Sequence, residues 1–235
     1  MIVATRTHAG WVRPNNQDTL LMSGRLYGVA DGMGGHNGGE VASTGAAAVI
    51  GDMLAGLEPN EKRLETGIQA ANRRLYQQQA EDAALAGMGT TVTVLWEGDD
   101  TVYIGHVGDS RAYLLRDGVF TQVTQDHSVV AEMMRQGILT KDKAKKHPYR
   151  NVITRAVGTA AGIEVDVICR DKRPGDIWLI CSDGLYGMVE EQDIEYTLKT
   201  LPLEEAAEHL LKLALDNGGR DNISLVLLMV AEVAQ

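Results

Sequence analysis

The stretch LYGVADGMGGHNGGEVAS, residues 26–43, decides the fold. Its apolar beginning predicts a buried strand over residues 25–30, its glycines predict a turn, and a helix is expected over about 40–55. Asp31 stands where the strand gives way to the glycine-rich turn. The position of an aspartate at the end of a buried strand needs an explanation, which the other aspartates of the chain supply.

The rest of the chain has the same mixture of strands and helices. Turn signals such as Asp99-Asp100 and Asp117-Gly118 join several apolar runs and favour antiparallel hairpins. Helices are expected in pairs, over about 40–55 and 61–80 and again over about 190–199 and 203–216. The other strands are expected over residues 2–6, 19–23, 90–96, 101–107, 111–116, 119–123, 163–169, 176–181 and 223–230. This order predicts an α+β fold in which helices cover antiparallel sheets.

Composition limits the class of protein. The 235 residues are 44% hydrophobic and contain no repeat or linker, so we expect a single domain over residues 1–235. A formal net charge of −10 argues against binding to nucleic acid or anionic lipid, because both are also negative. We expect a cytoplasmic protein without membrane insertion, since residues 1–11 lack a secretion signal and no segment is apolar for long enough. Cys169 and Cys181 lack metal or redox spacing and are expected to be buried small hydrophobic residues.

Four apolar segments place an aspartate at one of their ends. Asp31, Asp109 and Asp183 follow expected strands, and Asp221 precedes the last one. Asp-Gly is a common turn dipeptide, so a turn is the simpler interpretation of any one of them. Four carboxylates that converged would repel one another, and a divalent cation would remove that cost. Oxygen ligands, including the carbonyl of Gly32, suit Mg²⁺ or Mn²⁺ rather than zinc.

Two nucleotide-binding interpretations of the glycine-rich turn fail on sequence. A P-loop would need Lys and Ser/Thr where Glu40 and Val41 stand, and a dinucleotide fingerprint would need glycine at Asn37. A positive group near the carboxylates would instead suit a phosphate ester. Arg13 precedes Asp18 by five residues, so one loop can present both a guanidinium and a carboxylate.

Together these motifs resemble the bacterial branch of the metal-dependent protein serine/threonine phosphatases, the PPM or type 2C family. The resemblance covers essentially the whole chain. It rests on AGWVRPNNQD, VADGMGGHNGGEVAS, GMGTTVTV, HVGDSRAY, TQDHS, HPYRNVITRAVG, LICSDGL and GGRDNISLVL, in this order. It implies a four-layer αββα sandwich of two antiparallel β-sheets flanked by helix pairs, with a metal centre at one end.

The resemblance also implies a role for each candidate residue. Asp31 would bridge two Mn²⁺ or Mg²⁺ ions, the carbonyl of Gly32 would bind the second, and Asp183 and Asp221 would bind the first. Asp18 would position waters on the second ion, and Asp109 with Asp183 would bind a possible weaker third ion. Arg13 would hold the phosphoryl group while a water activated by both ions attacks phosphorus directly.

Two positions depart from relatives of this kind. Met33 stands where eukaryotic members have a histidine that is a candidate general acid, so either His36 or a metal-bound water is left for this step. Gln17 stands where many relatives have glutamate, and we expect a modest effect because glutamine still accepts hydrogen bonds.

The segment 124–158 falls where the family has a flap subdomain beside the site. It is rich in Lys, Arg and His, which suits either a solvated helix and loop or a surface that sets preference among phosphopeptides. The implied substrates are phosphoserine and phosphothreonine proteins, and the implied partners are a cognate Ser/Thr kinase and its substrates. Two alternatives are a phosphoprotein-binding module without turnover and an enzyme for small phosphate esters.

Overall fold

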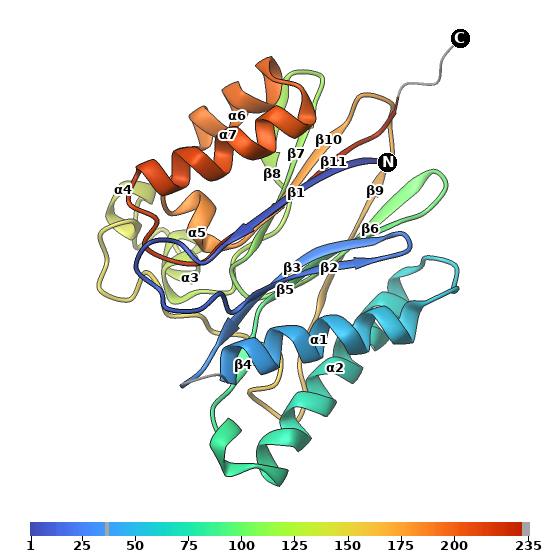
Figure 1. Ribbon diagram of the computed structural model, residues 1–235, viewed down its shortest axis with the longest axis vertical. Helices are drawn as coiled ribbons and strands as arrows, with labels where there is room; N and C mark the ends of the chain where they lie inside the picture. The colour runs from blue at the N-terminus through green and yellow to red at the C-terminus, as the bar shows by residue number, and fades with distance from the viewer. Residues whose placement is uncertain (36–37, 232–235) are drawn as a thin grey trace.

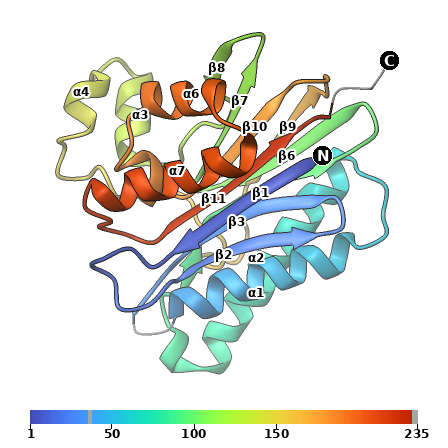
Figure 2. The same ribbon diagram turned by 45° about the horizontal axis from the view of Figure 1, so that its top comes forward.

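The computed structural model describes residues 1–35 and 38–231. Two antiparallel sheets lie face to face, and helices cover the outer side of each (Figure 1). Helices α1 and α2 cover one sheet, and α6 and α7 cover the other, as the turned view in Figure 2 also shows. This arrangement confirms the predicted α+β sandwich.

Sheet topology brings the two ends of the chain into one layer. The first sheet has the order β1-β11-β10-β7-β8, and the second has the order β2-β3-β5-β6-β9 with β4 paired to β3. The strands of the first sheet are β1 (Ile2–His8), β7 (Arg111–Arg116), β8 (Val119–Gln122), β10 (Ile177–Cys181) and β11 (Ile223–Met229). Those of the second are β2 (Asp18–Ser23), β3 (Leu26–Met33), β4 (Gly89–Thr90), β5 (Val92–Glu97), β6 (Thr101–Val107) and β9 (Asp166–Asp171).

The four long helices lie close to the predicted ranges. They are α1 (Gly38–Leu54), α2 (Glu61–Glu81), α6 (Glu191–Thr200) and α7 (Leu203–Asp216). Four short helices were missed because three to seven residues are too few to show helical periodicity. These are η1 (Ala83–Leu85), α3 (Val129–Arg135), α4 (Lys141–Ala144) and α5 (Asp183–Tyr186). Within the described residues, every helix is too short or too polar to cross a membrane.

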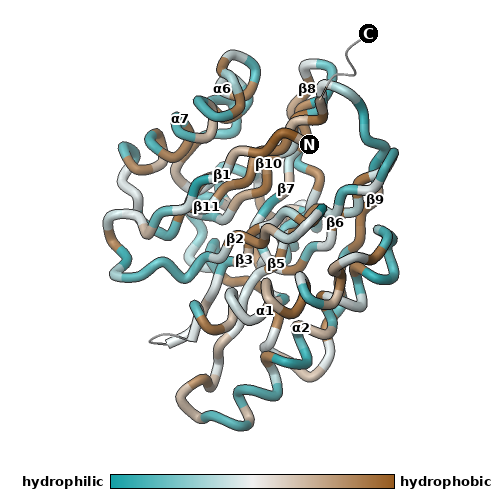
Figure 3. The backbone as a smooth tube through the Cα atoms, turned by 45° about the vertical axis from the view of Figure 1, so that its right-hand side comes forward, coloured by the Kyte–Doolittle hydropathy of each residue, from teal (hydrophilic) through white to brown (hydrophobic). Residues whose placement is uncertain are grey.

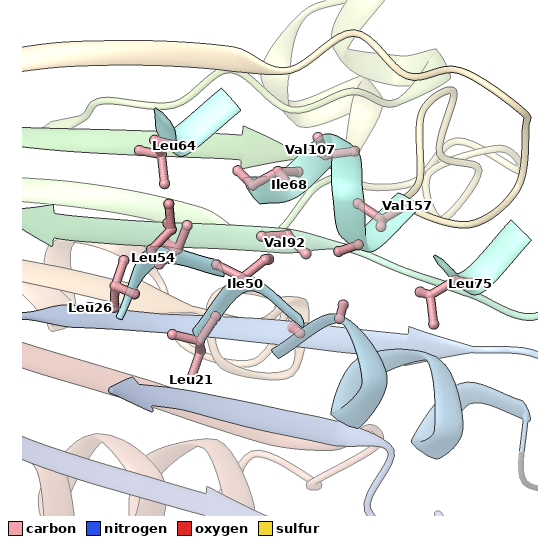
Figure 4. Close-up of a cluster of buried hydrophobic side chains, with 14 of the residues drawn as sticks. Leu21, Leu26, Ile50, Leu54, Leu64, Ile68, Leu75, Val92, Val107 and Val157 are labelled. Atoms are coloured by element: carbon pink, nitrogen blue, oxygen red, sulfur yellow. The ribbon is translucent and has the colours of Figure 1, made fainter. Parts of the chain in front are cut away.

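Three apolar layers hold the sandwich together. The strands carry most of the hydrophobic residues of the central layers, as the colours of Figure 3 show for β1, β10 and β11. Figure 4 shows the layer between α1, α2 and the second sheet, where Ile50, Leu64 and Ile68 are fully buried. Trp178 and Ile104 lie in the layer between the sheets, and Leu210 lies in the layer under α7. Burial on this scale is the main stabilising term of the fold.

Several local predictions need correction. Strand β3 continues to Met33 because Gly32 and Met33 pair with Thr90 and Gly89, so Asp31 lies inside the strand rather than at its end. Cys181 is buried as predicted, but Cys169 on β9 is only half-buried and its thiol donates to Glu61, 2.7 Å away.

The glycine after Asp183 allows two backbone segments to meet closely. A Cβ on Gly184 would lie 1.9 Å from the carbonyl oxygen of Asn222, and one on Gly32 would lie 2.0 Å from that of Gly39. Neither glycine has a positive φ, so close approach and not a left-handed backbone requires them. The first of these contacts joins the start of α5 to the start of β11.

Gly184→Ala is therefore expected to destabilise the protein by about 2 to 3 kcal/mol, because the new methyl group meets backbone that cannot turn away. Urea unfolding followed by circular dichroism measures the change. Gly162→Ala is the matched control, since a Cβ at Gly162 has no neighbour within 4 Å. Equal stability of the two variants would show that the close approach carries no strain.

Candidate active site

Both sheets deliver aspartates to the same end of the sandwich. Asp18 and Asp31 face each other as register partners on β2 and β3 of the second sheet. Asp183 begins α5 directly after β10 and Ser182, and Asp221 lies two residues before β11; β10 and β11 are neighbouring strands of the first sheet. Asp109 lies in the connection between β6 and β7, where the chain crosses from one sheet to the other.

The carboxylates are close enough to perturb one another. The pKa of Asp31 is raised well above its usual value, by burial first and then by the charges of Asp18, Asp183, Asp109 and Asp221. Burial, followed by the charges of Asp109, Asp221 and Asp18, likewise raises the pKa of Asp183. Burial is also the main cause that raises the pKa of Asp18 and of Asp109 to about 6. The structure thus brings all five predicted aspartates together in a strongly negative site.

Two of these carboxylates have an oxygen that fits a cation. The Oδ1 atoms of Asp18 and Asp183 are buried without a hydrogen-bond partner. A buried, unpartnered carboxylate oxygen is costly, and hard divalent cations prefer such donors. Within residues 1–35 and 38–231 the side chains, as they stand, form no group of three or more His, Cys, Asp or Glu that can hold an ion.

The backbone of Asp31 is held by the Gly89–Thr91 segment. Its N–H donates to the Thr91 hydroxyl at 3.0 Å, and its carbonyl accepts from the Thr90 hydroxyl and the Thr91 N–H, both at 2.9 Å. The Thr91 hydroxyl also lies 2.7 Å from that of Ser110, next to Asp109. Thr91 thus links two of the aspartates, a positioning role that sequence reasoning missed although it singled out GMGTTVTV.

A buried serine links Asp18 to the neighbouring sheet. The Ser182 hydroxyl donates to Oδ2 of Asp18 at 2.8 Å and accepts from the N–H of Ser224 at 3.0 Å. Ser182 directly precedes Asp183 in the chain. Its hydrogen bond therefore connects the side chain of Asp18 on β2 to the segment that carries Asp183. Ser182 was not predicted, because its only signal in the sequence is its position in the motif LICSDGL.

Arg13 lies at the rim of the site. Its Nη2 donates to Oδ2 of Asp221 at 2.7 Å, and its side chain is 54% exposed. A guanidinium that is both exposed and fixed beside a carboxylate is placed to meet an incoming anion. Arg13 therefore lies next to the acidic cluster, as predicted, and it contacts the cluster through Asp221.

Asn222 holds the loop that carries Arg13. Its side-chain amide donates to the carbonyls of Ala9 and Asn15, both at 2.9 Å, and accepts from the N–H of Gln17 at 2.8 Å. A buried amide that makes three such bonds is costly to replace. Asn222 is a further positioning residue that the sequence analysis did not identify, since it lies some two hundred positions from the loop it holds.

The Asp109 loop is tied to the segment 124–158 through Arg111. Tyr186 donates its hydroxyl to the carbonyl of Asp109 at 3.0 Å, and the Arg111 guanidinium lies 3.6 Å from the centre of the Tyr186 ring. Arg111 also donates through two nitrogens to the carboxylate of Asp126. In the same segment, Lys141 and Lys145 of the α4 region bind Glu191 and Glu190, each at 2.5 Å.

The remaining predicted residues have different outcomes. Gly32 is buried beside Asp31, and its N–H donates to the carbonyl of Gln17 at 3.2 Å. His36, one of the two candidates for the general acid, lies outside the described residues. Cys181 is buried and burial raises the pKa of its thiol, which excludes it as the nucleophile of a phosphocysteine mechanism.

Comparison with known proteins identifies the family. The sequence profile of "Protein phosphatase 2C" matches residues 13–219, and the chain belongs to this family. It is 38% identical to the serine/threonine protein phosphatase PstP of Mycobacterium tuberculosis over 97% of this chain, and spans 45% of that protein. It is 37% identical to the serine/threonine phosphatase stp of Listeria monocytogenes, with 94% of this chain and 93% of that one covered.

A solved structure agrees with the fold. The catalytic domain of PstP in complex with two manganese ions aligns with a TM-score of 0.90, 36% identity and 98% of both chains covered. The family and the unpartnered oxygens of Asp18 and Asp183 together support dependence on Mn²⁺ or Mg²⁺.

Asp18→Asn is expected to stabilise the protein in EDTA at pH 7.5 by up to about 3 kcal/mol, because a carboxylate with a raised pKa costs stability when ionised. The folded state takes up a proton as pH falls through about 6, whereas the unfolded carboxyl does so only near 3.8. The difference between variant and wild type should therefore shrink toward zero by about pH 4.

Urea unfolding at several pH values measures this difference, with the exposed Asp99→Asn as control. In saturating Mn²⁺ the sign should reverse, since the variant loses a negative charge beside the ions. A variant less stable than wild type at pH 7.5 in EDTA would contradict the electrostatic cost assigned to Asp18.

Proposed function

We propose that this chain is a metal-dependent phosphatase that hydrolyses phosphoserine and phosphothreonine in proteins. The observation that carries the proposal is the cluster of five aspartates, two of them with unpartnered buried oxygens, beside an exposed arginine. Carboxylates alone would repel a phosphate ester, so the cluster is useful to phosphate chemistry only when cations neutralise it. Family membership supports the same reaction class.

The roles of the site residues are part of this proposal. Asp31 would bridge two ions, Asp183 and Asp221 would hold one of them, and the Gly32 carbonyl would bind the other. When bound, the metal pair supplies an activated water and positive charge for the phosphoryl oxygens. Asp18 orients water by hydrogen bonds that Ser182 helps to fix, and Arg13 binds the equatorial oxygens of the phosphoryl group.

A weaker third ion at Asp109 and Asp183 is also proposed. Two observations support it. Burial raises the pKa of Asp109, and the charge of Asp109 raises the pKa of Asp183. Tyr186 and Arg111 hold the loop that carries Asp109. For the acid that protonates the leaving group, His36 and a metal-bound water both stay open.

The proposal extends to organisation and setting. Residues 1–235 would form one catalytic domain, with 124–158 as its flap subdomain. The substrates would be phosphoproteins of a cognate Ser/Thr kinase, and the enzyme would act in the cytoplasm. The relatives named as serine/threonine phosphatases support the substrate class.

The proposed reaction is tested by phosphate release from a phosphothreonine peptide. Release should require Mn²⁺, stop in excess EDTA, and fall in Asp31→Ala by well over the roughly 100-fold typical of residues outside the metal ligands. Asp99→Ala, which removes an exposed carboxylate paired with Arg25, is the control. Peptide binding without metal-dependent release would replace the enzyme with a phosphoprotein-binding module.

The flap should contribute to substrate preference through its free surface charge. Lys141 and Lys145 are neutralised by glutamates, whereas the side chains of Lys143 and Lys146 are exposed. Replacing Lys143 and Lys146 together by Ala is expected to lower kcat/KM for an acidic phosphopeptide by roughly threefold at low salt, and less at high salt. Lys62→Ala on α2 is the control, and equal kinetics on acidic and neutral peptides would refute this role.

A further inference from the structure

Two large apolar side chains stand exposed directly before Arg13. Trp11 is 67% exposed and Val12 is 66% exposed. Among the large hydrophobic residues that the structure describes, only Tyr196 is more exposed, at 70%. Single exposed apolar residues are common on protein surfaces, so exposure alone identifies no function.

Trp11 is nevertheless held in one position. Its backbone N–H donates to the carbonyl of Gly219 at 2.7 Å, and its indole Nε1 donates to the carbonyl of Leu215 at 3.1 Å. The His8 ring packs edge-on against the indole, with centroids 5.3 Å apart. Both N–H groups are thus used within the protein while the ring stays in solvent. A fixed apolar surface binds a ligand at a lower entropic cost than a mobile one.

The loop that carries Trp11 packs on the segment that carries Asp221. A Cβ on Gly10 would lie 2.3 Å from the carbonyl oxygen of Asp221 and 2.5 Å from that of Gly219, so the backbone before Trp11 packs directly on this segment. Arg13 binds the side chain of the same Asp221. Because Trp11 and Arg13 are two positions apart, their Cα atoms lie within about 7 Å, so the exposed ring and the predicted phosphoryl-binding guanidinium belong to the same short stretch of this loop.

We infer that Trp11 and Val12 form a recognition ledge for an apolar residue next to the phosphorylated one in the substrate. This inference rests on the proposed phosphatase function and names its preferred substrates. A phosphoryl group on Arg13 leaves the flanking peptide residues, spaced about 3.5 Å apart, within reach of this ledge. Leucine, isoleucine or phenylalanine within two positions of phosphothreonine would cover both side chains.

Charge supports the same choice of substrate. The chain carries a net charge of −10, so acidic residues near the phosphorylated one would be repelled wherever no lysine or arginine faces them. An apolar flanking residue avoids this repulsion and gains the burial of the indole face. The ledge therefore favours apolar over acidic neighbours on the Arg13 side of the site.

Kinetics on two matched phosphothreonine peptides test the ledge. One peptide carries leucine on both sides of the phosphothreonine, the other serine, and the readout is the ratio of their kcat/KM values in Mn²⁺. Wild type should favour the leucine peptide, and Trp11→Ala should reduce this ratio by roughly tenfold through KM. Trp11→Leu should keep part of the preference. Tyr196→Ala, which removes an equally exposed aromatic ring from α6, should leave the ratio unchanged.

An equal loss on both peptides in Trp11→Ala would mean that Trp11 only supports its loop, and would overturn the inference. A wild-type enzyme without preference for leucine would do the same. Thermal unfolding of each variant shows whether a loss reflects folding.

Tryptophan fluorescence gives a readout that needs no turnover. Trp96 and Trp178 are buried, at 2% and 0% exposed, so Trp11 is the exposed one of the three tryptophans. A non-hydrolysable phosphonate analogue of the leucine peptide should shift its emission to the blue and protect it from acrylamide in the Mn²⁺-loaded protein. Trp11→Phe should remove both effects.

Phosphate release and tryptophan fluorescence test the phosphatase function and the recognition ledge separately. Absence of phosphate release with a normal fluorescence shift would reject the phosphatase function and retain the ledge. Normal release without a shift would reject the ledge alone.

Discussion

Repulsion among buried carboxylates is the constraint on which the rest of the active-site end depends. Asp18 and Asp31 lie on two neighbouring strands, Asp183 begins a helix, and Asp109 and Asp221 lie in connections. Burial together with mutual charge raises the pKa of Asp31 and Asp183 well above the usual value. Such a cluster opposes folding unless neighbouring groups fix it and positive charge compensates it. The hydrogen bonds around the cluster hold the carboxylates in place, and the rest of the sandwich offsets their electrostatic cost.

The fixing groups act on the backbone as much as on the carboxylates. Thr91 holds the peptide of Asp31, Tyr186 holds that of Asp109, and Ser182 joins Asp18 to the opposite sheet. Each of these contacts joins segments that are at least sixty residues apart in the chain. Placing functional groups by rigid strands and buried hydroxyls gives a more exact geometry than loops alone would give. The apolar layers of the sandwich stabilise the fold, and this offsets the free-energy cost of the buried carboxylates.

The rim of the site is organised by a different principle. Asn222 binds the loop of Arg13 through three buried hydrogen bonds, while the outer faces of Trp11, Val12 and Arg13 stay in solvent. Arg111 links the Asp109 loop to Asp126 in the segment 124–158. The loops next to the acidic cluster are thus held by side chains that reach them from distant parts of the chain.

The sequence by itself determined the class of fold and the candidate aspartates. Alternation and helical spacing predicted all of the long elements, because burial of one face leaves a periodic pattern in the chain. The ordered motifs predicted the family, which the comparisons confirmed. Sequence also predicted which carboxylates would be unusual, since an aspartate next to an apolar strand is visible without coordinates.

Only the tertiary structure decided how these residues meet. Asp31 proved to lie inside β3, because the pairing of Gly32 with Thr90 depends on a strand almost sixty residues away. Asn222, Ser182 and Thr91 were not predicted, because a positioning residue is defined by its distant partner and has no local pattern. The close approach of Gly184 to Asn222 also joins distant segments, whereas a helix as short as α5 has too few residues to show periodicity. Local periodicity reports burial, whereas contacts between distant segments exist only once the sheets have packed.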